Sequence, residues 1–267
     1  MIKTLPALTV AALLTTTTGA FAQMNDGLMA IGLSGDKTLH QIDAATATVK
    51  ASMEVEGVTK LLGIDLRPAT GQLIGVTDTF DIVAIDPMTG ATTKISTMNT
   101  PLPIMGDAPV IVDFNPMADR LRFMSGTTNH RVNVDTGEVT VDGSLAYDSA
   151  DMHAGEEPAI VAAAYINSFG KPESTAMFNI DSTIVALIQQ TSPNDGVLAA
   201  IGKLGIDGSD SYAFDVATDA DGNNTAWLAT ADKLHTVSLE DGSVQESWDL
   251  MKTGGAMLRD ITFMTAK

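Results

Sequence analysis

Short runs in which apolar residues alternate with polar ones recur throughout the chain. The clearest example lies between positions 112 and 137, where the runs are separated by Asn-Pro, Ser-Gly and Asp-Thr-Gly. Alternation with a period of two is typical of a strand with one buried face, and the separating residues are typical of turns. The stretch therefore predicts a series of short antiparallel strands. The alternating apolar residues are Val112, Phe114, Leu121, Phe123, Val132 and Val134.

Two elements of this stretch occur again elsewhere. The first is a strand that ends in an apolar–Asp pair and a turn, found at His40–Thr48, Val83–Ala91, Val132–Glu138, Phe178–Thr183 and, more loosely, Thr236–Ser243. The second is a strand followed by Asp and an apolar residue, found at Leu62–Leu73, Ile111–Leu121, Tyr212–Gly222 and Arg259–Met264, while Val161–Ser168 takes the same place without the Asp. The copies are about 40 to 60 residues apart, which is the interval of a four-stranded propeller blade.

The repeats predict an all-β fold, a β-propeller of five blades. Four blades are expected at 61–98, 110–141, 158–201 and 212–248. The fifth combines Leu258–Met264 as its innermost strand with three strands in Leu28–Val55, so the C-terminal strand pairs with the N-terminal blade and closes the ring. Six blades and a β-sandwich are the alternatives. Ile184–Gln190 has a weak helical pattern but is assigned as a strand from its place in the repeat.

The first 22 residues have the pattern of a signal peptide. Lys3 precedes a short apolar run, Leu5–Leu14, and Ala20–Ala22 form a small-x-small cleavage site. We expect cleavage after Ala22, a single propeller domain over 27–265, and a periplasmic or secreted bacterial protein. No later stretch is long enough to span a membrane, and the absence of cysteine argues against a lipid anchor and against disulfides.

The chain is strongly acidic, with 15 basic and 33 acidic residues and a formal net charge of −18. Such a surface repels nucleic acid and anionic lipid. The expected partners are therefore a small molecule, a metal ion or another exported protein. No GxSxG, HExxH or phosphate-binding loop occurs in the sequence, and we assign no catalytic residue.

Six stretches also resemble a known bacterial family. They are Gly63–Leu73, Ala84–Gly90, Asp113–Pro116, Asp119–Arg122, Asn129–Gly137 and Ala162–Ser168. In these segments the chain is similar to the family DUF4394, a domain of unknown function. The resemblance covers nearly all of the chain after residue 22. It implies an exported, propeller-like protein and supplies no catalytic residues.

In a propeller, the loops between blades share one face, and on this chain they are the long ones. They are Thr97–Pro109, Asp142–Pro158, Ile201–Ser211 and Asp249–Met257. Long loops on a rigid scaffold are where binding sites usually form. We therefore expect a ligand pocket on this face, whereas the short turns of the opposite face are expected to be structural.

Two groups of residues are candidates for a divalent cation such as calcium. Asp65, Asp113, Asp215 and Asp260 fall at matching places in four innermost strands, where they can form a carboxylate ring. Alternatively, each Asp accepts backbone amides of the neighbouring blade and holds the blades together. The second group is Asp148, Asp151 and His153 in the loop Asp142–Pro158. Because its spacing fits no standard metal signature, a solvated acidic loop over the channel mouth is the favoured interpretation.

A third group suggests recognition of an organic ligand. Arg120, Arg122 and Arg131 can form an anion or carboxylate clamp, or they can make structural pairs across a hairpin. A hairpin centred near 127–128 would place Arg120 opposite Asp135 and Arg122 opposite Asn133. The full set of candidate ligand-binding residues is Asp113, Asn115, Arg122, Asn129, His130, Arg131, Tyr165 and Asp215.

The leading functional hypothesis is an exported, non-catalytic binding or scaffold propeller with a loop-built pocket on one face. The alternative is a lactonase-like hydrolase that depends on calcium, zinc or manganese. In that case the channel carboxylates would hold the ion that polarises an ester carbonyl.

Overall fold

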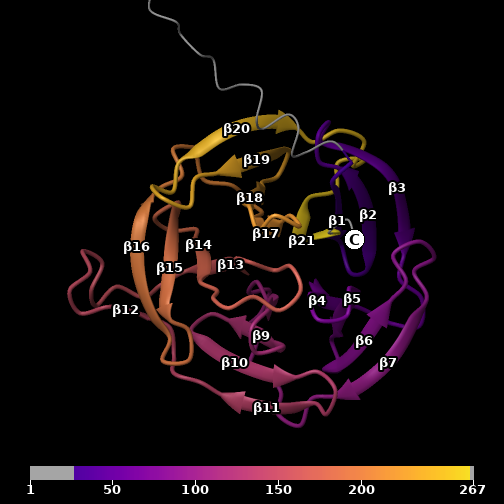
Figure 1. Ribbon diagram of the computed structural model, residues 1–267, viewed down its shortest axis with the longest axis horizontal. Coiled ribbons are helices and arrows are strands. Elements are labelled where there is room, and N and C mark those ends of the chain that lie inside the picture. The colour runs from indigo at the N-terminus through magenta and orange to yellow at the C-terminus, as the bar shows by residue number, and fades with distance from the viewer. Residues whose placement is uncertain (1–26, 265–267) are drawn as a thin grey trace, which may run out of the picture.

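The computed structural model describes residues 27–264, which form a ring of five antiparallel sheets around a central axis (Figure 1). Within these residues every regular element is a strand, and no helix is long and apolar enough to cross a membrane. The all-β, five-bladed propeller predicted from the repeats is therefore confirmed. The predicted signal peptide, 1–22, lies outside the described residues.

Each blade is a meander that runs outward from the axis. Blade one contains β4 (Leu61–Arg67), β5 (Gln72–Thr77), β6 (Asp81–Ile85) and β7 (Thr92–Thr97). Blade two contains β8 (Ile111–Asn115), β9 (Arg120–Ser125), β10 (Thr128–Asn133) and β11 (Glu138–Val141). Blade three contains β13 (Ile160–Tyr165), β14 (Met177–Asp181), β15 (Ala186–Ser192) and β16 (Val197–Lys203), with β12 (Ala146–Tyr147) added outside β16. Blade four contains β17 (Ala213–Thr218), β18 (Asn224–Ala229), β19 (Lys233–Val237) and β20 (Val244–Asp249).

Blade five closes the ring with both ends of the described chain. Its innermost strand is β21 (Leu258–Met264), followed outward by β1 (Met29–Ser34), β2 (Thr38–Asp43) and β3 (Thr48–Glu54). β21 and β1 are antiparallel, with Met264 opposite Met29 and Ile261 opposite Gly32. This pairing confirms the predicted closure and satisfies the backbone groups that would otherwise form an open sheet edge.

The innermost strands are buried almost throughout because each is covered by its own blade and by both neighbouring blades. The apolar cores accordingly lie between blades. At the closing junction, Trp227 of blade four is fully buried and stacks on Phe263 of blade five, with ring centroids 5.4 Å apart. Burial of this kind, in the absence of any cysteine, is what stabilises the ring.

One local prediction of strand register differs from the structure. The β9–β10 hairpin has only two residues between Ser125 and Thr128, so Arg122 lies opposite Arg131 and not opposite Asn133. The sequence pattern places the strands, but the turn decides the register. The helical pattern at 184–190 is correctly assigned to a strand, β15.

The acidic loop 142–158 also lies elsewhere than the suggested position over the channel mouth. Its short strand β12 pairs in parallel with β16 on the outer edge of blade three (Figure 1). The Tyr147 hydroxyl donates to Asp181, and the backbone N–H of Ala200 donates to Asp151, at 2.7 and 2.8 Å. These bonds fix the loop against the rim of the propeller.

Candidate functional site

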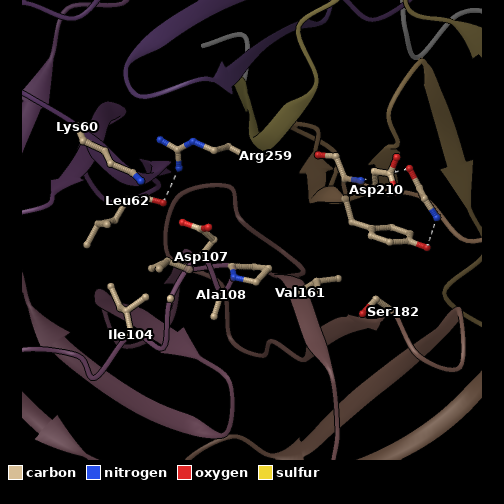
Figure 2. A pocket seen from close by; sticks show the side chains of 15 residues that line it. Lys60, Leu62, Ile104, Asp107, Ala108, Val161, Ser182, Asp210 and Arg259 are labelled. Carbon is tan, nitrogen blue, oxygen red and sulfur yellow. Dashed lines mark hydrogen bonds between the residues drawn. The ribbon is translucent and has the colours of Figure 1, made fainter.

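A pocket of about 440 Å³ lies at one end of the propeller axis, where the five innermost strands begin (Figure 2). We call it the mouth pocket. Every blade contributes to it, because the chain enters each innermost strand at this face. The contributing residues at the strand starts are Lys60, Val110, Val161, Tyr212 and Arg259.

Two of the four predicted loops line the mouth pocket. The loop 97–109 provides Ile104 and residues 106–109, and the loop 201–211 provides Ser209, Asp210 and Ser211. The loop 142–158 does not reach it, since that loop runs along the outer edge of blade three. The pocket therefore lies on the face expected from loop length.

Charged side chains of both signs line the mouth pocket. In Figure 2, Lys60 and Arg259 lie along one side and Asp210 lies across from them, with Asp107 between them in this view. Asp107 and Asp210 are exposed, and within the described residues neither makes a salt bridge within 4.0 Å. The remaining wall is largely apolar and includes Leu62, Ile104, Val110 and Val161.

Arg259 is held in place by backbone carbonyls. Its guanidinium donates to the carbonyl oxygens of Gly35, Asp36, Leu61 and Leu62, which uses four of its five N–H groups. Within the described residues, no carboxylate lies within 4.0 Å of it. Burial lowers the pKa of Arg259 from its usual value, as expected for a cation that lacks an anionic partner.

A second candidate lies deeper along the axis, where Asp65, Asp113 and Asp215 converge. One carboxylate oxygen from each residue lies within 4.8 Å of the others, and all three side chains are buried. Desolvation raises the pKa of all three, that of Asp215 to about 6, and mutual repulsion adds to the effect at Asp65 and Asp113. Three carboxylates this close must share protons or accept a cation.

The same carboxylates join successive blades. Asp65 accepts the backbone N–H of Phe114, Asp113 that of Tyr165, and Asp215 that of Phe263, at 2.7, 2.9 and 2.9 Å. Each bond runs from one innermost strand to the innermost strand of an adjacent blade. The structural alternative to a carboxylate ring is thus present, and it exists together with the cluster.

Asp260 does not occupy the matching place in blade five. The residue that matches Asp65 is Thr262, whose hydroxyl accepts the N–H of Leu66 and donates to Asp65. Asp260 lies two residues earlier and accepts the N–H of Ile64 at 2.7 Å, with burial raising its pKa to about 7. In blade three the matching residue is Ala164, because Tyr165 aligns with Phe114. The predicted four-membered set is therefore three aspartates and one displaced aspartate.

Little space adjoins the carboxylate cluster. The cavity bordered by Asp65, Asp215 and Thr262 has a volume of only about 10 Å³. It has room for about one water molecule or ion. The carboxylate oxygens fit the preference of calcium or magnesium for hard ligands. The cavity can hold an ion, but it has no room for an organic substrate.

Arg122 of the predicted arginine clamp belongs to a buried hydrogen-bond network, whereas Arg131 at its edge is partly exposed. Arg122, 1 % exposed, donates to Asn129, Asp142, Asn194 and the Tyr165 hydroxyl at 2.7 to 3.3 Å. Arg131 donates twice to the same Asp142 carboxylate. The bonds of Arg122 engage its whole guanidinium group, and they connect blade two to blade three.

Asn115 and Tyr165 line one cavity, and the other candidates are dispersed. Asn115 accepts the N–H groups of Met117 and Ala118 and so fixes the turn after β8. His130 is buried, with no hydrogen-bond partner for Nδ1 among the described residues. On the acidic loop, His153 contacts Glu156, and the Asp148 and Asp151 carboxylates accept backbone N–H groups of their own turns. The structure thus brings together Asp65, Asp113 and Asp215, and separately Arg122, Asn129, Arg131 and Tyr165.

Sequence reasoning missed the charged residues of the mouth pocket. Lys60, Asp107 and Asp210 lie outside the repeated elements, and Arg259 begins one copy whereas the other copies begin with Leu62, Ile111 and Tyr212, so repeat comparison gives no reason to select them. The available signal was positional, since Lys60 and Arg259 stand at the starts of predicted innermost strands. Combining strand starts with charge would have selected them.

Three solved structures to which the chain is similar have low sequence identity to it. A protein of unknown function from Bacteroides caccae is 12 % identical, with 83 % of this chain and 73 % of that chain covered and a TM-score of 0.44. A luciferin-regenerating enzyme is 13 % identical over 84 % and 81 %, with a TM-score of 0.46. An auxiliary nutrient binding protein from Bacteroides ovatus is 10 % identical over 76 % and 54 %, with a TM-score of 0.45.

No curated protein matches the chain. One family does, over residues 38–262, and it is the one suggested by the sequence motifs of blades one to three. The match extends from β2 of blade five to β21 of the same blade and therefore includes parts of all five blades. The chain belongs to DUF4394, a family described as a domain of unknown function.

Proposed function

We propose that the protein is an exported, non-catalytic binding propeller that holds a small molecule in the mouth pocket. The observation that carries this proposal is the construction of the pocket, to which all five blades and two inter-blade loops contribute. Its volume of about 440 Å³ lies within the usual range for small-molecule sites. A closed ring of sheets gives such a site a rigid frame.

The lining of the mouth pocket supports binding rather than catalysis. It contains no histidine, and no cysteine occurs in the chain. A Ser–His pair does occur nearby, with Ser247 Oγ and His235 Nδ1 2.7 Å apart. The same pair recurs in blade five, where Ser52 and His40 are 2.8 Å apart. A feature repeated from blade to blade is better explained as part of the repeat than as an active site.

The proposal is tested by screening the purified protein with amino acids, sugars, organic acids and nucleosides, using melting temperature and then calorimetry. Ala108→Trp places an indole in the pocket wall, while Thr93→Trp adds the same group on the exposed outer strand β7. We expect a ligand whose binding is lost in Ala108→Trp and retained in Thr93→Trp. A ligand that binds both variants equally would contradict the proposed site.

Export is tested separately on the full chain expressed in a Gram-negative bacterium. The expected result is a periplasmic or secreted protein whose N-terminal residue is Gln23. Recovery of the protein in the cytoplasm with Met1 retained would contradict the exported part of the proposal.

A second candidate is the metal-dependent, lactonase-like hydrolase, which is favoured by the convergence of Asp65, Asp113 and Asp215. A catalytic ion needs an open position that the substrate reaches, and the adjoining cavity of about 10 Å³ does not provide one. Melting curves with calcium, zinc or manganese, each with and without chelator, test whether the cluster binds an ion. Hydrolysis of simple lactones that disappears with chelator would favour this candidate over the binding protein.

A further inference from the structure

We infer that the mouth pocket takes a small zwitterion with an apolar body, the chemistry of a free amino acid or a short peptide. The inference rests on the proposed binding function and specifies its ligand class. The carboxylate of the ligand lies beside Lys60 and Arg259, and its ammonium group lies beside Asp210. The juxtaposition of these charges across one pocket is shown in Figure 2.

The side of the pocket that takes the ligand's carboxylate is identified by the hydrogen bonds of Arg259. Other buried arginines of this protein pair with acidic side chains, Arg67 with Asp119 and Arg122 with Asp142. Arg259 instead faces four carbonyl oxygens and, within residues 27–264, keeps one N–H group without a protein acceptor. An incoming carboxylate would supply both an acceptor and a counter-charge.

Lys60 adds a second cation on the same side. Its ammonium lies 3.9 Å from Asp36, at the limit of an ion pair, and 45 % of its side chain is exposed. The group is therefore able to turn toward a ligand at little cost in existing contacts. Together the two cations mark one side of the pocket as the place for a negative group.

The carboxylate of Asp210 provides the complementary end. Among the described residues it takes part in no ion pair, and it lies across the mouth pocket from Lys60. Asp107, on the loop 97–109, carries a second negative charge over the same space. With two cations and two anions in the lining, a ligand of zero net charge and separated poles fits better than an anion or a cation.

The charge of the whole protein leads to the same choice. A formal charge of −18 slows the approach of any anionic ligand but has little effect on a neutral zwitterion. Leu62, Ile104, Val110 and Val161 offer an apolar surface between the charged sides. A side chain such as that of leucine would cover it.

The test is a matched ligand series measured by calorimetry on the mature protein. Leucine and the dipeptide Leu-Leu are compared with their N-acetyl derivatives, which are anions, and their C-terminal amides, which are cations. At least one of the two zwitterions is expected to bind, and each single modification should weaken binding about tenfold or more, because each removes one charge-assisted contact.

Variants assign the two ends of the ligand. Lys60→Gln is expected to weaken zwitterion binding about tenfold and to leave the affinity for the C-terminal amide unchanged, since the amide has no carboxylate to lose. Asp210→Asn should weaken zwitterion binding by a similar factor and leave the affinity for the N-acetyl derivative unchanged, since that derivative has no ammonium group. Lys50→Gln is the control, because Lys50 pairs with Asp43 away from the pocket. Arg259 itself is left intact, since its bonds to four carbonyls also support the fold.

Two results would overturn the inference. One is equal affinity for the zwitterions and their blocked derivatives, and the other is no binding of either zwitterion by a protein that melts cooperatively. Neither result removes the proposed binding function, which fails only if the broader screen finds no ligand sensitive to Ala108→Trp. The two failures are therefore distinguishable.

Discussion

The carboxylate of Asp65 accepts the backbone N–H of Phe114, a residue on the next blade, at 2.7 Å. Asp113 and Asp215 make the same bond to Tyr165 and Phe263. A propeller blade has no hydrogen-bonded sheet contact with its neighbour, so these side chains supply polar bonds that the sheets themselves do not make. The cluster at the axis is a consequence, because the bonds that hold adjacent blades bring three carboxylates together.

The first prediction concerns this connection between blades. Asp215→Ala removes the acceptor of two buried N–H groups, those of Val216 and Phe263, and should lower the free energy of unfolding by about 2–3 kcal/mol. The measurement is urea denaturation at pH 5, where the raised pKa values of the cluster keep charge repulsion small.

The control for this variant is Asp221→Ala, in the exposed hairpin between β17 and β18, which should change stability by less than about 0.5 kcal/mol. An Asp215→Ala protein as stable as the wild type would mean that these bonds do not hold the blades. Because Asp215 is not among the residues that line the mouth pocket, small-molecule affinity there should be unchanged.

The second prediction concerns pH. Burial raises the pKa of Asp260 to about 7 from an ordinary value of 3.8. Between these two values the folded state binds more protons than the unfolded state, so the contribution of Asp260 to stability is fully present below pH 4 and is lost as pH rises to about 7. The full effect is on the order of 4 kcal/mol.

The variant Asp260→Asn isolates this effect, because it cannot ionise. The free energy of unfolding of the wild type minus that of the variant should fall as pH rises from 4.5 to 7.5. The comparison is needed because burial lowers the pKa of His40, His130 and His235, which costs stability as pH falls below about 6.5. Glu246→Gln, on an exposed strand position, is the control, and a difference that does not depend on pH would refute the prediction.

The third prediction comes from the repeated histidines. His40 lies opposite Ser52 and His235 opposite Ser247, each within hydrogen-bond distance at Nδ1. His130 occupies the same place in blade two, but it lies opposite Val141 and its Nδ1 has no partner among the described residues. Val141→Ser should supply that partner and raise the free energy of unfolding by about 0.5–1 kcal/mol.

Val141→Ala is the matched control for the serine variant. It removes the same branched side chain from an exposed strand position without adding a hydroxyl, so it should be neutral or slightly destabilising. Urea denaturation of both variants gives the comparison. Equal stability of the serine and alanine variants would show that His130 gains nothing from the hydroxyl.

The sequence predicts those parts of the fold that are repeated along the chain. Alternating apolar residues and the Asp-bearing turns are repeated, so they predict five blades and their closure. Asp260 is misplaced by two residues because it is followed by an apolar residue, as Asp65 is, and positions two apart lie on the same strand face. The bond that Asp260 accepts from the N–H of Ile64 shows its true place. The charged residues of the mouth pocket are unique to their blades, and a comparison of repeats has no basis for finding them.

The last prediction uses two glycines to separate backbone strain from close packing. Gly137 has a φ of 75°, and a Cβ added there would lie 1.9 Å from the carbonyl oxygen of Thr97, on the outer strand of the preceding blade. Gly126 has a φ of 56°, but a Cβ there would meet nothing within 4 Å. Gly126→Ala should therefore cost only the left-handed conformation, about 1 kcal/mol.

Gly137→Ala should cost more than about 3 kcal/mol, because the turn must also move away from blade one. A Cβ added at Gly90 or Gly242 would likewise lie 2.4 or 2.6 Å from a carbonyl oxygen of the preceding blade, that of Glu54 or Gly202. Close packing of a turn glycine against the preceding blade thus recurs at the rim of the ring. The aspartates connect the blades at the axis. Urea denaturation of both alanine variants measures it, and equal losses would place the whole cost in the backbone conformation.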